Sequence, residues 1–506
     1  MKPSAYAEEV KAEVTAPAGI EQVRDDPPPE RTEDPFGLLL AEKRDEEERQ
    51  TGIAALLKTI LQNSSMADGT TDPEELIAGI IAEIDKRLSA QINLILHNEA
   101  FQRLEGTWRG LHYLVFQSPT ANDIKIRVLN LSFHEMFSCL KKYPGTTWDQ
   151  SPLFKLIYES EFGTAGGEPF GCLIGDYYFD ETPPRVETLK RIAKIASAAH
   201  VPFISGTSPA VMNMDSWQEL ANPRDYSRIF NSPEYLTWRN LRDNPDSRYI
   251  ALTLPRVLAR IPYGSRTSPV NGMDFEEDVG AGVPHNHCWM NAAFVMGGNV
   301  IRAYAKYGWC VRIYGFDGGS CTDLLPSGQY PFYEDSPVPS PLEIAITDQR
   351  ETELSRNGFL ALCSLKNTNR AVFQSGQTLY KAKTFSTNAA TKNEELSSKL
   401  PCVFAVSRFA HYLKCILRDK IGGFQAPKEM ERWLNDWLAD YVSGDPDAPD
   451  EIKAKYPMAE ARVRVVPHRD KPGHFEAEIY LRPHYQLDGL TAAIKLIAQI
   501  PERDKI

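Results

Sequence analysis

The chain has 506 residues, of which 42% are hydrophobic and 25% are charged, as is ordinary for a globular protein with room for more than one domain. Its 68 acidic and 56 basic residues give a net charge of −12, which argues against a nucleic-acid-binding protein because such proteins usually carry a basic surface. The N-terminus lacks the apolar core of a signal peptide, and residues 288–300, the best membrane candidate, are too few to cross a bilayer. The eight cysteines contain no C-x-x-C pair, which favours reduced thiols. The sequence therefore predicts a soluble cytosolic protein without membrane insertion.

The N-terminal part of the chain divides into two segments. Residues 1–35 are rich in Glu, Ala and Pro, and we expect them to form an extended or disordered arm. Residues 36–98 contain two apolar stripes and form an expected helical segment. The second helix of this segment is predicted to start with Asp72 as N-cap, Pro73 in the first turn and Glu75 at the capping-box position.

Residues 99–425 are expected to form a mixed core, which gives the chain an α+β (mixed α/β) fold class. Helical patterns alternate there with short strands, predicted at Ile124–Leu131, Phe170–Leu173 and Trp309–Tyr314. The run Pro326–Pro341 contains five prolines and is predicted to be a connector.

Residues 426–506 are predicted to contain an amphipathic helix, a β-hairpin and a terminal helix. Met430, Trp433 and Trp437 lie on one side of the first helix, and the terminal helix carries a second apolar stripe. The terminal stripe includes Leu490, Ile494 and Ile497. Such stripes exceed what a monomer needs to expose, so we expect both helices to lie in protein interfaces.

The hairpin is predicted from strict alternation in residues 461–466 and 475–482, which are separated by the turn Pro467–His474. The apolar face consists of Ala461, Val463, Val465, Phe475, Ala477, Ile479 and Leu481. The expected cross-strand pairs are Val465 with Phe475, Val463 with Ala477, Arg464 with Glu476, and Arg462 with Glu478. No third strand follows in the sequence, so the hairpin edges need a strand from elsewhere in the chain or from another chain. Assembly is therefore the first function to test.

Catalytic chemistry has little support in the sequence. The cluster His285-Asn286-His287-Cys288 could present two imidazoles to a metal, but a structural zinc site needs four ligands and no second His/Cys pair exists. No other residues form a catalytic constellation, so we predict a protein that is not an enzyme and needs no cofactor. A metal-dependent enzyme that uses His285 and His287 is the alternative that stays open.

A series of sequence blocks between residues 101 and 487 carries a family resemblance. These blocks are Phe101–Leu111, Leu173–Tyr177, Pro202–Ser205, Ala305–Cys310, Glu343–Asp348, Ala405–Lys414, Arg418–Gly422 and Leu481–Leu487. In this order they resemble the large subunit of the type VI secretion contractile sheath, the TssC or VipB family. The resemblance implies a fold like that of the contractile phage-tail sheath and a structural subunit in the bacterial cytosol.

The resemblance also implies the partners. Members of the family pair with a small sheath subunit (TssB/VipA-like) and with copies of themselves, forming a helical tube on a baseplate around an inner tube of Hcp-like protein. Contraction drives the inner tube and its effectors out of the cell. In the family the C-terminal strands receive strands from neighbouring protomers. Here these strands contain Arg462, Val463, Arg464, Val465, Phe475, Glu476, Ala477, Glu478, Ile479 and Leu481. A homopolymeric phage-type sheath is the alternative assembly.

A last implication concerns disassembly. In the family an AAA+ unfoldase (ClpV-like) recognises an N-terminal helix of the large subunit. The best local match is Leu38, Leu39 and Leu40 together with Ile53, Leu56 and Leu57. The alternative is a helix packed on its own core or on the partner.

Overall fold

The computed structural model describes residues 73–116, 119, 124–222, 225–265, 267–279, 286–316, 322–323, 340–366, 368, 370–419, 427–445, 447–467 and 475–484. The chain forms two units, Met1–Gly79 and Ile80–Ile506. The arm, the proposed unfoldase signal (Leu38, Leu39, Leu40, Ile53, Leu56, Leu57), His285, most of the proline-rich connector and the terminal helix with Leu490, Ile494 and Ile497 lie outside the described residues.

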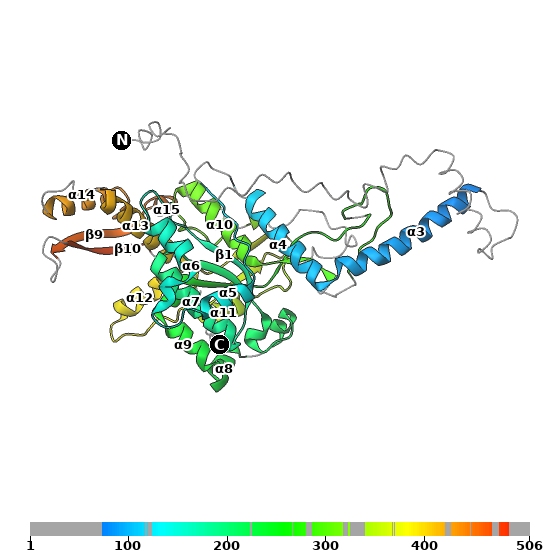
Figure 1. Cartoon of the computed structure of the whole chain (residues 1–506), viewed down its shortest axis with the longest axis horizontal. Coiled ribbons are helices and arrows are strands. Elements are labelled where there is room, and N and C mark those ends of the chain that lie inside the picture. Colours follow the sequence, from blue (N-terminus) through cyan, green and yellow to red (C-terminus); the bar gives the residue numbers. More distant parts are fainter. Residues whose placement is uncertain are drawn as a thin grey trace, which may run out of the picture. The chain divides into compact units, whose positions relative to one another are not determined.

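A mixed sheet forms the centre of the second unit (Figure 1). Its strand order is β1 (Leu173–Phe179), β2 (Phe203–Thr207), β3 (Ile250–Leu254), β7 (Phe359–Ser364), β8 (Arg370–Phe373) and β6 (Thr322–Asp323). The first four strands run parallel, whereas β8 is antiparallel to both β7 and β6. Parallel strands are normally covered on both faces, and every residue of β2 and β3 is buried.

Two apolar clusters cover the two faces of this sheet. Phe203 and Leu252 belong to the cluster that includes α7 (Pro183–Ala199) and α9 (Leu236–Asp243). Their neighbours Ile204 and Ala251 belong to the cluster that includes α4 (Glu99–Phe116) and α10 (Ala292–Tyr307). Successive residues of a strand point to opposite faces, so the sheet lies between two layers of helices.

Helix α4 packs unusually close to the core because two glycines face it. A Cβ atom at Gly106 would lie 2.3 Å from the carbonyl oxygen of Trp289, and one at Gly110 would lie 2.3 Å from the ring of Phe294. Both positions fall in the sequence block that begins at Phe101. The close approach fixes which face of α4 points away from the core.

A third apolar cluster holds the C-terminal region together. It joins α13 (Leu400–Asp419), α14 (Pro427–Ala439) and strands β9 (Met458–Pro467) and β10 (Phe475–Pro483). Trp309, which follows α10, also belongs to it and stacks on Phe409 of α13 with ring centroids 4.5 Å apart. Figure 1 shows β9 and β10 running alongside α14.

The other elements lie around these three clusters. The helices are α3 (Pro73–Leu96), α5 (Phe133–Lys141), α6 (Pro152–Phe154), α8 (Tyr226–Asn231), α11 (Asp348–Arg356), α12 (Asn388–Ser397) and α15 (Asp450–Lys455). Short 3-10 helices occupy Thr147–Gln150, Pro209–Met212, Trp217–Ala221, Pro233–Tyr235 and Pro245–Tyr249, and Lys155–Gly163 is a π-helix. Strands β4 (Val257–Leu258) and β5 (Trp289–Met290) form a separate antiparallel pair.

The predicted mixed fold, the helix beginning at Pro73, the amphipathic helix α14 and the C-terminal hairpin are confirmed. Three strand predictions need correction. Ile124–Leu131 and Trp309–Tyr314 form no strand, and the strand expected at Phe170–Leu173 begins only at Leu173. In the first two segments the pattern is that of a strand, but neither segment pairs with a strand of the described chain. The carbonyl of Ile313, for example, accepts from the side chain of Asn299 instead.

Among the described helices, α13 alone has the length and apolar composition that could span a bilayer. Its residues Phe404, Phe409 and Leu413 are buried in the apolar clusters of the protein.

Candidate assembly interface

The C-terminal hairpin keeps the predicted faces but not the predicted pairs. Strand β9 is antiparallel to β10, with Ile479 opposite Val463 and Glu478 opposite Arg464. The expected pairing of Val463 with Ala477 is therefore wrong by two residues. A shift of two residues leaves every side chain on its own face, so alternation alone cannot detect it. The remaining three predicted pairs, Val465 with Phe475, Arg464 with Glu476 and Arg462 with Glu478, are shifted in the same way.

The observed register is supported by the ends of the ladder. It extends the hairpin to Pro467 opposite Phe475 and places Arg482 opposite Glu460. These last two side chains form an ion pair with a nitrogen–oxygen distance of 3.2 Å. Both side chains are about half exposed, so the pair contributes to the register more than to stability.

The apolar face of the hairpin packs against helices of the same chain. Val463 is only 1% exposed and belongs to the third cluster with Leu434 and Phe409. Partly buried residues of both strands pack against that cluster: Ala461, Val465, Ala477 and Leu481. Ile479, in contrast, is 40% exposed. The hairpin is thus anchored to α13 and α14 by most of this face, and Ile479 remains exposed.

The predicted interface residues of α14 lie in the same place. Met430, Trp433 and Trp437 are half-buried against the third cluster, and the ring centroid of Trp437 lies 6.0 Å from that of Phe409. Their stripe therefore packs largely on the hairpin and on α13. An interface role for α14 stays a prediction, and it concerns the part of these side chains that remains exposed.

The outer edge of β9 is occupied by side chains of α14. The side-chain amide of Asn435 donates to the carbonyl oxygen of Val463 at 2.8 Å, and the N–H of Val463 donates to Asn435 Oδ1 at 2.9 Å. The N–H of Val465 donates to Glu431 Oε2, also at 2.9 Å. The backbone groups of Val463 therefore point away from β10. Since antiparallel neighbours alternate between bonded and non-bonded pairs, those of Ile479 point away from β9.

The outer edge of β10 has no such cover. Within the described chain β10 pairs only with β9. The backbone groups of Ala477, Ile479 and Leu481 that point outward make no hydrogen bond among the described residues. An edge of this kind is a template for another strand.

Exposed apolar side chains also occur on α4 and on residues 124–130. On α4, Phe101, Leu104 and Trp108 are exposed, the last by 63%, on the side opposite the two packed glycines. Residues 124–130 have exposed apolar side chains at Ile126, Val128 and Leu129 and form no backbone hydrogen bond within the described residues. Exposed patches of this kind mark interaction sites. The spacing of Phe101, Leu104 and Trp108 by three and four residues is the sequence signal that predicts this exposed stripe.

A buried ionic network ties α4 to the segment that follows β4. The guanidinium of Arg260 lies between two carboxylates, 2.7 Å from Glu105 and 2.5 Å from Glu277. Burial by itself would raise the pKa of Glu105, but hydrogen bonds from Arg260 and Arg109 outweigh it and hold the pKa below its usual range. Removing one member would leave a buried charge unpaired, so this network is a structural brace.

The metal-site alternative gains no support from the described residues. They contain no group of three or more His, Cys, Asp or Glu side chains that could hold a metal ion. Burial raises the pKa of the Cys288 thiol to about 12. The thiolate, which is the form that binds metals, is therefore disfavoured.

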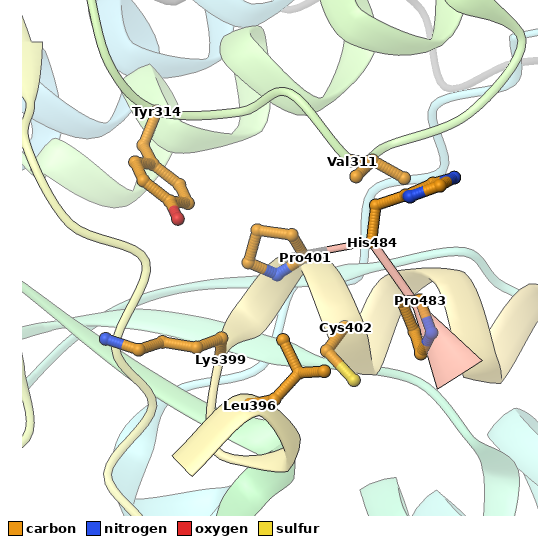
Figure 2. A pocket seen from close by; sticks show the side chains of 8 residues that line it. All are labelled: Val311, Tyr314, Leu396, Lys399, Pro401, Cys402, Pro483 and His484. Carbon is orange, nitrogen blue, oxygen red and sulfur yellow. The ribbon is translucent and has the colours of Figure 1, made fainter. Parts of the chain in front are cut away.

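One small hollow lies between the C-terminal end of β10 and the start of α13 (Figure 2). Its lining residues are Val311, Tyr314, Leu396, Lys399, Pro401, Cys402, Pro483 and His484. Burial raises the pKa of Cys402 to about 12 and lowers that of His484. The lining includes the Cys402 thiol and the His484 imidazole, but the raised pKa of the thiol disfavours the thiolate that nucleophilic catalysis needs.

The fold and the site define a structural protein in which an anchored hairpin with one open edge is available for assembly. Comparison with known families agrees with this class. Residues 78–380 match the model VipB, described as the EvpB/VC_A0108 tail sheath N-terminal domain. Residues 389–500, which include the hairpin, match VipB_2, the tail sheath gpW/gp25-like domain of the same proteins.

A curated relative gives the same result. The chain is 48% identical over 479 residues to the type VI secretion system sheath protein TssC1 of Pseudomonas aeruginosa PAO1, covering 93% of this chain and 96% of the relative. The chain therefore belongs to the VipB tail sheath family and is a structural subunit of the type VI secretion contractile sheath. The resemblance inferred from the sequence blocks is confirmed.

Proposed function

We propose that the chain pairs with a small TssB/VipA-like subunit and polymerises with copies of itself into a helical tube. The tube surrounds an Hcp-like inner tube, starts from a baseplate in the bacterial cytosol, and contracts to expel the inner tube with its effectors. A contact that does not close on itself generates an open helix, as a tube requires. The open outer edge of β10 carries this proposal, because strand addition supplies such a contact through main-chain hydrogen bonds.

The links between protomers are proposed at the hairpin, around residues 462–465 and 475–481. The exposed surfaces of α4 and of residues 124–130 are proposed as contacts for the small subunit, since they are apolar and their exposed side chains do not belong to the cluster that holds the hairpin. The remaining exposed surface of α14 and the terminal helix would add to the interfaces. The division into an arm (1–35), a helical segment (36–98), a core (99–425) and a linking region (426–506) is part of the same proposal.

Co-expression tests this function directly. The chain alone should aggregate, whereas the chain with the neighbouring small subunit should give long hollow tubes in negative-stain microscopy. Tubes formed without the small subunit would favour the homopolymeric phage-type sheath. A clean monomer at micromolar concentration, with no tubes under either condition, would contradict the assembly proposal. Elemental analysis of the purified chain would test the metal-dependent enzyme.

A further inference from the structure

The two outer edges of the hairpin differ in the hydrogen bonds that the described chain makes to them. On β9, Met458 exchanges backbone hydrogen bonds with the segment that follows α14, donating to the carbonyl of Tyr441 at 3.4 Å and accepting from the N–H of Ser443 at 2.9 Å. Farther along, Val463 is bonded by Asn435 and Val465 by Glu431. The last outward position of β9 is Pro467, which has no N–H.

The outward positions of β10 show the opposite pattern. Phe475, Ala477, Ile479 and Leu481 lie opposite Pro467, Val465, Val463 and Ala461, and all four have an N–H group. Pro483, which lies opposite Met458, has none. Neither a side chain nor a backbone segment of the described chain bonds to the outward groups of Ala477, Ile479 or Leu481. Within the described chain, β9 is therefore closed at Met458, Val463 and Val465 but not at Ala461, whereas β10 is open at Ala477, Ile479 and Leu481.

The closure depends on a match between helix and strand geometry. Four residues of an α-helix rise about 6 Å, and two residues of an antiparallel strand rise about 6.8 Å. Positions 431 and 435 of α14 therefore fall beside the outward positions 465 and 463 of β9. The carboxamide of Asn435 offers one donor and one acceptor, as a peptide group does. Asn435 thus takes the place that a neighbouring strand would occupy.

We infer that Asn435 and Glu431 direct strand exchange to β10. A strand from a neighbouring copy of the sheath protomer then pairs with Ala477, Ile479 and Leu481 and is excluded from β9. Addition at β9 would first require the loss of three hydrogen bonds, and Pro467 could donate none in return. This inference rests on the proposed strand exchange, and it specifies the edge at which the exchange takes place.

Hydrogen exchange, resolved to single amides, tests the inference on the full-length heterodimer before and after tube formation. We expect Val463 and Val465 to be protected in both states. Ile479 and Leu481 should exchange at least tenfold faster than Val463 in the heterodimer and become protected in tubes. Protection that appears at Val463 and Val465 only in tubes would overturn the inference. If the wild-type heterodimer forms no tubes, the proposed function fails. Rapid hydrogen exchange of the Val463 amide in the heterodimer would separately disprove the closure of the β9 edge by Asn435.

A matched pair of proline variants gives a second test. Ile479→Pro removes an outward N–H on β10 that the hairpin ladder does not use, and Val465→Pro removes the equivalent N–H on β9. We expect Ile479→Pro to give folded heterodimer without tubes, and Val465→Pro to keep forming tubes. Tubes from Ile479→Pro would overturn the inference. If Val465→Pro fails to fold, Glu431→Gln is the substitute, because it weakens the same contact with the N–H of Val465. This variant should still form tubes. Loss of tubes in folded Glu431→Gln would also count against the inference.

Discussion

The carboxamide of Asn435 binds the backbone of Val463 twice, with nitrogen–oxygen distances of 2.8 and 2.9 Å. Val463 is almost completely buried, so these two backbone groups have little access to water as an alternative partner. A single side chain of α14 therefore fixes both the position and the register of β9 against the helix.

Asn435→Ala should lower the free energy of unfolding by about 2 kcal/mol, because it leaves a buried donor and a buried acceptor without partners. Denaturant unfolding of the heterodimer would measure this loss. Asn435→Asp keeps an acceptor for the N–H of Val463 and should lose less. Equal stability of wild type and Asn435→Ala would contradict the importance of this contact.

Charge reversal across the hairpin tests the observed register. Glu478 lies opposite Arg464, so the double variant Arg464→Glu/Glu478→Arg should recover most of the stability that either single change loses. Opposite-charge cross-strand pairs are worth about 0.2–1 kcal/mol. The control is Arg462→Glu/Glu478→Arg, whose positions are not paired in the structure. Better recovery in this control would favour the register predicted from the sequence, in which Arg462 lies opposite Glu478.

Trp108 should contribute to binding of the small subunit, because it is the largest exposed apolar side chain on the outer face of α4. Trp108→Ala should weaken the heterodimer at least fivefold, or about 1 kcal/mol, since aromatic residues dominate interface energies. Leu236→Ala changes an exposed apolar residue at the start of α9 and should leave the affinity unchanged. Unchanged affinity of Trp108→Ala in a titration would exclude this face of α4 from the interface.

Stability should fall in mild acid because of His411, which is 2% exposed. Its Nε2–H donates to the carbonyl of Ala199 at 2.9 Å, and Arg408, Lys414 and His200 lie around the ring. Burial, aided by these cationic neighbours, lowers the pKa of His411 from 6.5 to about 4. The folded state therefore binds fewer protons than the unfolded state between these two values.

The contribution of His411 should be fully present above pH 6.5, decline as the pH falls, and level off below about pH 4. Its size is about 3 kcal/mol at most. Comparing unfolding curves of wild type and His411→Gln from pH 7 to pH 4 isolates this contribution, with the exposed His134→Gln as control. Parallel pH profiles of wild type and His411→Gln would contradict the prediction.

Deleting residues 1–62 should leave tubes intact but abolish their disassembly by the unfoldase, if Leu38 to Leu57 contain the recognition signal. The measurement is the rate at which contracted tubes disappear in the presence of unfoldase and ATP. A milder variant with Leu38, Leu39 and Leu40 changed to Ser separates recognition from loss of the arm. Failure to form tubes would instead assign the segment a structural role.

Sequence patterns located the C-terminal elements well because each pattern has one dominant period. The alternation of residues 461–466 predicted the hairpin, and the spacing of Trp433 and Trp437 predicted α14. The contact between Asn435 and Val463 could not be predicted in this way. It depends on how a helix and a strand 28 residues apart are aligned in space.

The central sheet was less accessible to sequence analysis. Ile250–Leu254 and Phe359–Ser364 are apolar on both faces, so they have no alternation to distinguish them from buried helix. Ile124–Leu131 shows the reverse case, since its pattern is that of a strand but the described chain provides no partner. A strand pattern reports what a segment can pair with, and the partner decides whether a sheet forms.

The stacking of Trp309 on Phe409 has a mechanical consequence. Phe409 also contacts Trp437 and Tyr441, with ring centroids 6.0 and 5.6 Å apart, and the same cluster includes Val463 of β9. Tension applied to the hairpin by a neighbouring copy would therefore reach the end of α10 through packed rings rather than through a slack connection. Such a stiff path loses little displacement as a shortening tube transmits its stroke from one ring of subunits to the next.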